Sequence, residues 1–370
     1  YKGNPALLQD ERLKRWHLMM NESPEQGVKA AGELISAGSQ GDIPPAMLDS
    51  TIARTVWNAY TKTAETYNDP GHFTALIGYE WTSLIKGNNL HRVVIFRGDR
   101  TKADQIQPFT FADSTDPEDL WAFMQAYEDK TGDLALAIPH NGNLSNGMMF
   151  MPEKISGKSF DREYAETRAR WEPVYEVTQI KGDGESHPLL SPNDEFAGYE
   201  VWDKGNLDMS QKKVDEMLQY EYAREALKMG LQIEKKLGVN PFKFGMVGST
   251  DSHTALVAVE EENFFGKHTG KEPSAHRWNK PVLATPSGNV MGWEQVSSGL
   301  AAVWATDNTR EAIWDAYNRR EVYATTGSRI FLRFWGGWNF APSDAKSRLP
   351  AEIGYTKGVP MGADLQGAAE

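Results

Sequence analysis

One stretch of sequence, FKFGMVGSTDSHT at residues 242–254, is central to the predicted fold. Its apolar first half predicts a buried strand, which Gly248 and Ser249 would end. Asp251 and His253 follow two residues apart, so an extended backbone would place both side chains on one side. A carboxylate and an imidazole at the carboxyl end of a strand are typical of metal or catalytic sites. The Asp-x-His pattern alone also occurs by chance.

A predicted hairpin lies earlier in the chain. Residues 73–81 and 90–96 are apolar runs rich in β-forming side chains, and the Lys-Gly-Asn-Asn segment at 86–89 between them is typical of a turn. Glu80 would stand at the end of the first strand and His91 at the start of the second. We therefore expect the hairpin to bring this carboxylate and this imidazole close together.

Two further predicted strands also end in polar residues. Residues 134–138 form a short apolar run that leads directly into His140. Residues 174–180 form another, and the Gly- and Pro-containing turn that follows carries Glu185 and His187. For His187, a purely structural turn and a contact with substrate or metal are equally compatible with the pattern.

Helical periodicity predicts helices between these strands. They comprise three helices within residues 5–68 and single helices at 117–127, capped by Asp116, and at 161–171, 212–237 and 310–320. Additional strands are expected at 199–202, 300–304 and 322–330, the last extended by 331–335, and the irregular segment 260–292 suggests a lid. The alternation of helices and strands indicates an α/β barrel or a layered α/β fold with a mainly parallel sheet.

The composition excludes several classes of function. Lys and Arg number 39 against 51 Asp and Glu, a balance of −12 without a basic run, so nucleic acid is disfavoured as a bulk partner. The chain of 370 residues has no Cys, which excludes thiolate nucleophiles and thiolate metal sites and leaves His, Asp and Glu as ligands. No apolar run approaches the roughly 18 residues of a membrane span.

Five potential metal ligands lie at the predicted strand ends: Glu80, His91, His140, Asp251 and His253. Such a donor set suits Zn, Mn or Fe, and two ions sharing a bridging carboxylate would account for its size. A metal pair of this kind activates water and clamps a phosphoryl oxygen. The alternative is that each residue is a hydrogen-bonded core or turn residue. An anionic substrate would need nearby cationic and polar groups, for which we expect Lys181, Arg329, Asn141, Glu185 and His187.

Four stretches resemble, in order, metal-binding motifs of the PHP superfamily of metal-dependent phosphoesterases. They are Gly78-Tyr79-Glu80-Trp81, Leu90-His91, Ile138-Pro139-His140-Asn141 and Gly248-Ser249-Thr250-Asp251-Ser252-His253. With residues 179–182, 193–197 and 319–327, nearly the whole chain is similar to a large bacterial family of uncharacterised PHP-like proteins, the domain-of-unknown-function family 3604.

The resemblance implies a PHP-like distorted (β/α)7 barrel, similar to a TIM barrel, with two or three divalent metal ions. It implies that Glu80 bridges two metals, that His91 and His140 complete one, that Asp251 binds the first and that His253 binds a third. The superfamily also has an opening His-x-His strand, which is not found before Glu80. We therefore expect a chain truncated at both ends, with a barrel possibly incomplete at its N-terminal strands.

Three segments are expected on this basis: residues 1–72 as a helical segment inserted in or packed on the barrel, 73–340 as the barrel, and 341–370 as a linker towards a missing C-terminal region. The expected function is metal-dependent hydrolysis of small phosphate esters by a metal-activated water, with Glu80, Asp251 and His253 at the catalytic centre. Alternatives are a non-catalytic oxyanion- or metal-binding module and an amidohydrolase-like C–N hydrolase, whose typical Lys ligand has no clear candidate. Relatives often carry export signals, which favours a periplasmic or secreted location over the cytoplasm.

Overall fold

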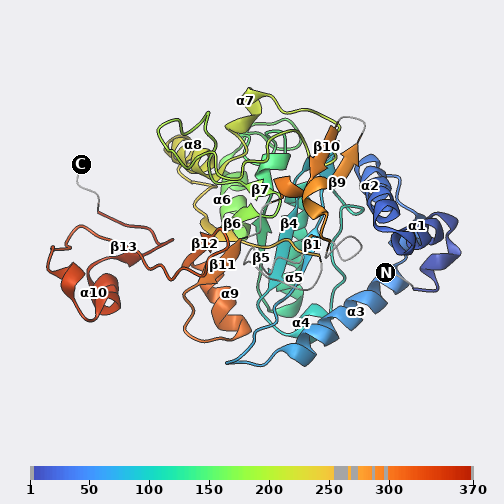
Figure 1. Cartoon of the computed structure of the whole chain (residues 1–370). Coiled ribbons are helices and arrows are strands. Elements are labelled where there is room, and N and C mark those ends of the chain that lie inside the picture. The colour runs from blue at the N-terminus through green and yellow to red at the C-terminus, as the bar shows by residue number, and fades with distance from the viewer. Residues whose placement is uncertain (1–3, 254–265, 268–273, 286–287, 296–298, 368–370) are drawn as a thin grey trace.

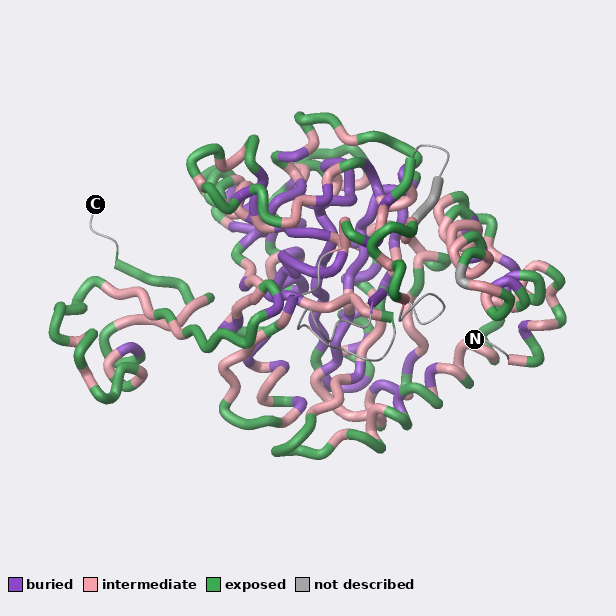
Figure 2. The backbone as a smooth tube through the Cα atoms, viewed as in Figure 1, coloured by how far each residue is buried: buried purple, intermediate pink, exposed green. Residues whose placement is uncertain are grey.

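The computed structural model describes residues 4–253, 266–267, 274–285, 288–295 and 299–367. Strands β1, β4, β5 and β6 lie in the middle of the molecule, α1 and α2 lie at one end, and α10 and β13 lie at the opposite end (Figure 1). The buried residues are concentrated around the central strands, whereas both terminal regions are largely exposed or half-buried (Figure 2). The central strands therefore contain the main core.

The first sheet has the strand order β1-β4-β5, with both pairs antiparallel. Its strands are β1 (Ile77–Trp81), β4 (Arg92–Phe96) and β5 (Ala135–Pro139). A small ladder of β2 (Leu84–Ile85) and β3 (Asn88–Asn89) joins β1 to β4. Lys86 and Gly87 form its turn with positive φ angles of 52° and 82°, as two-residue hairpins require. The predicted hairpin is thus confirmed.

The second sheet has the order β7-β6-β8. Strand β6 (Val174–Gln179) pairs in parallel with β8 (Gly245–Gly248) and antiparallel with the short β7 (Gly182–Asp183). A third ladder joins β11 (Leu300–Val303) to β12 (Val322–Thr325), and this pair packs against β8. Strand β5 lies beside β6, but the described residues form no ladder between them.

The expected seven-stranded barrel is wrong for the part of the chain that is described, where small separate sheets take its place. A barrel of alternating strands and helices needs parallel strands, and each parallel connection needs a crossover of a dozen or more residues. Residues 82–91 link β1 to β4 through a tight hairpin and are too few for such a crossover. β1 and β4 are consequently antiparallel; β5 also pairs antiparallel with β4, and β6 and β8 form the parallel pair.

The N-terminal region contains three amphipathic helices, each with a side-chain cap at its N-terminus. These are α1 (Glu11–Glu22), α2 (Pro24–Gln40) and α3 (Ser50–Tyr67), capped by Asp10, Ser23 and Asp49. Ala30 and Ala37 of α2 are buried in a small cluster with Trp16 and Met19 of α1. Helix α2 also contacts β2 and β9, which places it against the central part of the molecule.

The remaining helices are α4 (Arg100–Ala103), α5 (Pro117–Thr131), α6 (Arg162–Trp171), α7 (Asp215–Leu218), α8 (Ala223–Leu237), α9 (Arg310–Asn318) and α10 (Pro350–Lys357). Among them, α5, α6 and α9 agree with predicted ones, whereas α4 and α10 were not predicted. Asp116 caps α5 as expected. The single long helix predicted at 212–237 is wrong, because Tyr222 has an extended backbone and Glu221 is fully buried, where it pairs with Lys213.

Two predicted strands are also absent from the described structure. Residues 199–202 form a turn in which Glu200 has a φ of 50°, a conformation incompatible with a strand. Strand β12 ends at Thr325, and residues 331–334 do not extend it, because they form no ladder with the described strands and Phe331 is 89% exposed. The chain pairs next at β13 (Trp335–Gly336) with β14 (Val359–Pro360).

The irregular segment 260–292 lies partly outside the described residues. Its described part includes an antiparallel hairpin of β9 (Pro281–Thr285) and β10 (Gly288–Met291) beside α2.

Short 3₁₀ turns connect elements throughout the described chain; they are η1 (Leu7–Gln9), η2 (Pro45–Leu48), η3 (Gly142–Leu144), η5 (Arg277–Asn279), η6 (Gly292–Glu294) and η7 (Asp344–Lys346). Among the described residues, no helix combines the length and apolarity that crossing a membrane requires.

Candidate metal centre

The register of the first sheet brings three potential metal ligands to one face. Glu80 of β1 pairs with Val93 of β4, and Val93 lies two residues from His91, so Glu80 and His91 share a face. Arg92 pairs with Pro139, which makes His91 and His140 direct neighbours one position beyond this pair. The His140 N–H donates to the His91 carbonyl at 3.4 Å, which extends the ladder to these two residues. A slip of one residue would move a donor to the opposite face.

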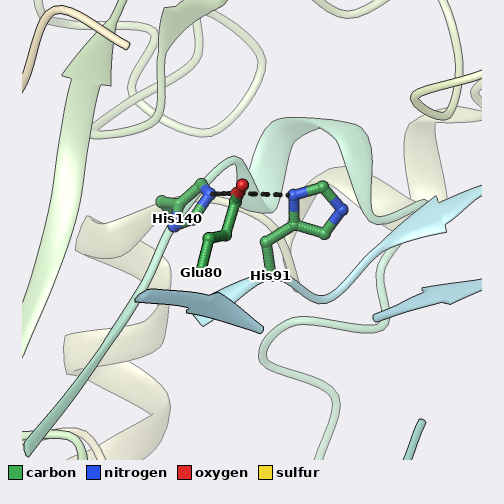
Figure 3. A group of neighbouring side chains, drawn as sticks. All are labelled: Glu80, His91 and His140. Atoms are coloured by element: carbon green, nitrogen blue, oxygen red, sulfur yellow. Dashed lines mark hydrogen bonds and ion pairs between the residues drawn. The ribbon is translucent and has the colours of Figure 1, made fainter. Parts of the chain in front are cut away.

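The three side chains converge on one point (Figure 3). Oε1 of Glu80 lies 3.0 Å from Nδ1 of His91 and 2.9 Å from Nε2 of His140. One ligand atom from each residue lies within 4.8 Å of the other two. Both imidazoles are buried, whereas the Glu80 side chain is 42% exposed. The group is therefore rigidly placed yet open on the side of the carboxylate.

The electrostatics of the group favour an ionised Glu80 and an uncharged His91. Burial opposes the charge of Glu80, but His91 and His140 outweigh it and hold the pKa of this carboxyl well below its ordinary value. Burial lowers the pKa of His91, although Glu80 opposes this effect. An ionised carboxylate and a neutral imidazole are the forms of Glu80 and His91 that bind a metal ion.

The hydrogen bonds of the two rings test whether the group fits a cation. Nδ1 of His140 lies 3.4 Å from the carbonyl oxygen of Ile138, and Nε2 lies 2.9 Å from Oε1 of Glu80. Both oxygens can only accept, so a neutral ring that donates to one of them leaves a nitrogen lone pair facing the other. Nε2 of His91 is buried without a hydrogen-bond partner among the described residues. A cation between the donors would relieve this excess of lone pairs, and a backbone carbonyl commonly orients a metal-binding imidazole in this way.

The predicted ligands Asp251 and His253 line the same cavity as Glu80 and His91 but lie outside the three-residue group. Strand β8 ends at Gly248, and Asp251 has a left-handed backbone with a φ of 49°, so the expected extended geometry is wrong. Nε2 of His253 nevertheless lies 3.1 Å from Oδ1 of Asp251. The ammonium groups of Lys181 and Lys267 both form ion pairs with Asp251.

The two lysines form a buried pair at the polar end of this cavity. Burial lowers the pKa of Lys181 well below its ordinary value, and the neighbouring Lys267 lowers it further. Burial also lowers the pKa of Lys267, to about 7. Nζ of Lys267 lies 3.2 Å from Nε2 of His253. Two close, desolvated ammonium groups favour a bound anion, and Asp251 occupies that role in the protein alone.

Of the residues expected to bind substrate, Lys181 lines the cavity, and the structure places the others elsewhere. Oδ1 of Asn141 accepts a hydrogen bond from Gln179. Glu185 forms an ion pair with Arg224, and His187 contacts Asp203 at 3.0 Å. Arg329 is exposed in the segment that follows β12. These positions leave Lys181 as the member of that set beside the candidate metal centre.

Two charged residues near the site escaped the sequence analysis. Lys267 lies in a segment without helical or strand periodicity, so its sequence offers no signal. Glu176 sits in the fully buried strand β6, where its Oε2 accepts a hydrogen bond from Ser249 at 2.5 Å and its Oε1 has no partner among the described residues. A lone Glu within an apolar strand was the available signal for the second residue.

The fold and the donor group define a mixed α/β protein with a candidate metal centre in a cavity. Residues 1–370 match the family model described as "Protein of unknown function (DUF3604)", so the chain belongs to this family. No curated protein and no solved structure matches the chain. The sequence-based assignment to family 3604 is confirmed, whereas membership of the PHP superfamily stays a prediction.

Proposed function

We propose that this protein is a metal-dependent hydrolase of phosphate esters, related to the PHP phosphoesterases. The proposal is carried by one observation: Glu80 and His91 of the group of three potential metal ligands line a cavity together with Lys181 and Lys267. Three protein ligands that leave coordination positions open are typical of catalytic metal sites, whereas structural sites are closed. Cationic side chains beside such a site suit an anionic substrate.

In this proposal Glu80, His91 and His140 hold one divalent ion, with Mn, Fe and Zn as candidates. The bound ion would supply an electrophilic centre that activates water and polarises a phosphoryl oxygen. Lys181 and Lys267 would bind the remaining phosphoryl oxygens in place of Asp251. Asp251, once released from the lysines, and His253 would then face the substrate or a second ion.

The test uses the full chain, purified without added metal. We expect Mn, Fe or Zn in elemental analysis and turnover of p-nitrophenyl phosphate that His140→Gln abolishes while circular dichroism stays unchanged. The control His72→Gln alters an exposed histidine, 82% accessible at its side chain, and should keep full activity. A folded protein without any of these metals would refute the proposal, and bound metal without turnover of phosphate esters would indicate a non-catalytic binding module.

A further inference from the structure

The cavity at the candidate metal centre has two chemically different ends. Its volume is about 390 Å³. Glu80, His91, Lys181 and Lys267 contribute to the polar end. The rest of the described lining is mostly apolar and includes Val28, Ala31, Ile35, Leu84, Met47 and Val290. A site for inorganic phosphate alone would leave this apolar wall in contact with water.

Helix α2 supplies most of one wall. Val28, Ala31 and Ile35 recur at three- and four-residue intervals, so they form one stripe along the helix. The face that carries Ala30 and Ala37 is already buried against α1. The stripe is therefore a second apolar face, half-buried and directed into the cavity instead of into a packed core.

The cavity also has unfilled space next to the α2 wall. Gly32 and Gly38 both line the cavity, and a Cβ atom added at Gly32 would meet no atom within 4 Å. Glycine within a helix is unfavourable by roughly 0.5–1 kcal/mol relative to alanine, so two of them in one wall reduce helix stability while they enlarge the cavity.

The polar end determines the charge of the ligand. Lys181 and Lys267 both form ion pairs with Asp251 in a largely desolvated setting. An oxyanion at this end would satisfy both ammonium groups, while a hydrocarbon group attached to it would displace water from the α2 wall. Both ends can be satisfied at once only by a molecule that carries an anion and an apolar group.

We propose that the substrates are phosphate monoesters of short apolar alcohols, either alkyl chains or a single aromatic ring. This inference rests on the proposed function for its phosphoryl chemistry. In the reaction water adds to phosphorus, the P–O bond to the alcohol breaks, and the alcohol leaves with one proton from water while inorganic phosphate remains. Ligand cavities range from roughly 300 to 1,000 Å³. This one, at about 390 Å³, suits a compact apolar group rather than a two-chain lipid.

The first experiment measures binding separately from turnover. Methyl, butyl, hexyl and octyl phosphate are titrated calorimetrically into the full chain, both metal-free and loaded with Mn²⁺. We expect binding to tighten about three- to fourfold per added methylene until the cavity is full, with an increasingly negative heat-capacity change. Equal affinity for methyl and hexyl phosphate would overturn the inference. Chain-length dependence without any hydrolysis would support the apolar wall as a binding site for the alcohol group but refute the proposed function, and these esters would then be ligands and not substrates.

The second experiment fills the apolar end. Gly32→Phe should weaken hexyl phosphate at least tenfold and leave methyl phosphate within twofold, because the ring occupies the space in front of α2. Gly32→Ala is the matched control and should keep both affinities. Val28→Thr keeps the side-chain shape but introduces a hydroxyl, and it should weaken hexyl phosphate several-fold even if the phenylalanine variant fails to fold. Equal loss of both ligands, or no loss in any folded variant, would contradict the assignment of this wall.

Discussion

The two main sheets contribute differently to the same cavity. The first sheet presents Glu80, His91 and His140 from positions that its strand register determines, and among the described residues no lysine or arginine forms an ion pair with Glu80. The second sheet leads to Lys181 and Asp251, which form an ion pair, and Asp251 also pairs with Lys267. The donor group of the first sheet is thus arranged to accept a cation, whereas the charged side chains at the second sheet already pair with one another.

The charges buried deeper in the two sheets show the reverse contrast. Beside the first sheet, Glu172 is bound by Arg92 at 3.0 Å, by Arg168 at 3.1 Å and by the Trp121 indole at 3.2 Å. In the second sheet, Oε1 of Glu176 has no partner among the described residues, and burial raises the pKa of Asp183. A compensated framework therefore supports the metal-ligand group, while unbalanced charge accumulates on the side that would meet the substrate.

The largest effect is expected where the framework of the first sheet is broken. Glu172→Gln leaves the guanidinium groups of Arg92 and Arg168 buried without a carboxylate, since their side chains are only 1% and 4% exposed. The free energy of unfolding should fall by about 3–5 kcal/mol in urea titrations. Glu166→Gln in the same helix removes an exposed ion pair and should change it by less than about 1 kcal/mol. Equal effects of both variants would show that the buried pair is unimportant.

The uncompensated charge of the second sheet predicts a pH dependence with a defined sign. Burial raises the pKa of Asp183 to about 7, despite backbone N–H groups that donate to its carboxylate. Between about pH 4 and 7 the folded state then holds a proton that the unfolded state has lost, so this group makes unfolding easier as pH rises through that window. The contribution is roughly 2–4 kcal/mol over the window.

Urea titrations from pH 4.5 to 7.5 measure the free energy of unfolding of wild type and of Asp183→Asn. The difference between the two pH profiles gives the contribution of Asp183. The asparagine variant lacks the ionisation, so its stability should fall less with rising pH. Asp194→Asn is the control, because hydrogen bonding to Arg224 lowers the pKa of Asp194 and moves its titration below the window. Parallel pH profiles for wild type and Asp183→Asn would contradict the prediction.

The metal affinity of the first sheet's donor group should depend on each of its members. Glu80→Gln and His140→Ala each remove one donor, and we expect the affinity for Mn²⁺ or Zn²⁺ to fall on the order of 100-fold or more. Competition with a chromophoric chelator measures this loss, and His72→Ala serves as the surface control. Retention of wild-type affinity in both variants would place the metal elsewhere.

The smallest effect is expected at Asp251, and it sharpens the contrast between the two sides. Because Lys181 and Lys267 already hold this carboxylate, Asp251→Asn should change metal affinity by less than tenfold, measured by the same chelator competition. A loss as large as that of Glu80→Gln would instead support the five-ligand cluster that the sequence suggested.

Local patterns predicted most individual elements. The hairpin turn at Lys86 and Gly87, the strand before His140 and the Asp116 cap depend on neighbours within a few residues, and all three are present. The break at Glu221 and Tyr222 was not predictable in this way. It depends on a buried ion pair with Lys213, and helical periodicity contains no information about such a partner.

The residue pattern alone was sufficient to nominate Glu80, His91 and His140, because each stands beside an apolar strand in a hairpin or turn whose register follows from alternation. It could not assign the direction of the strands, and the antiparallel pairing of β1 with β4 arises from a connection too short for a crossover. Nor could it place Lys267 or the α2 stripe at the same cavity. Those contacts join segments far apart in the chain, so only the packing of helix α2 and of the two sheets brings them together.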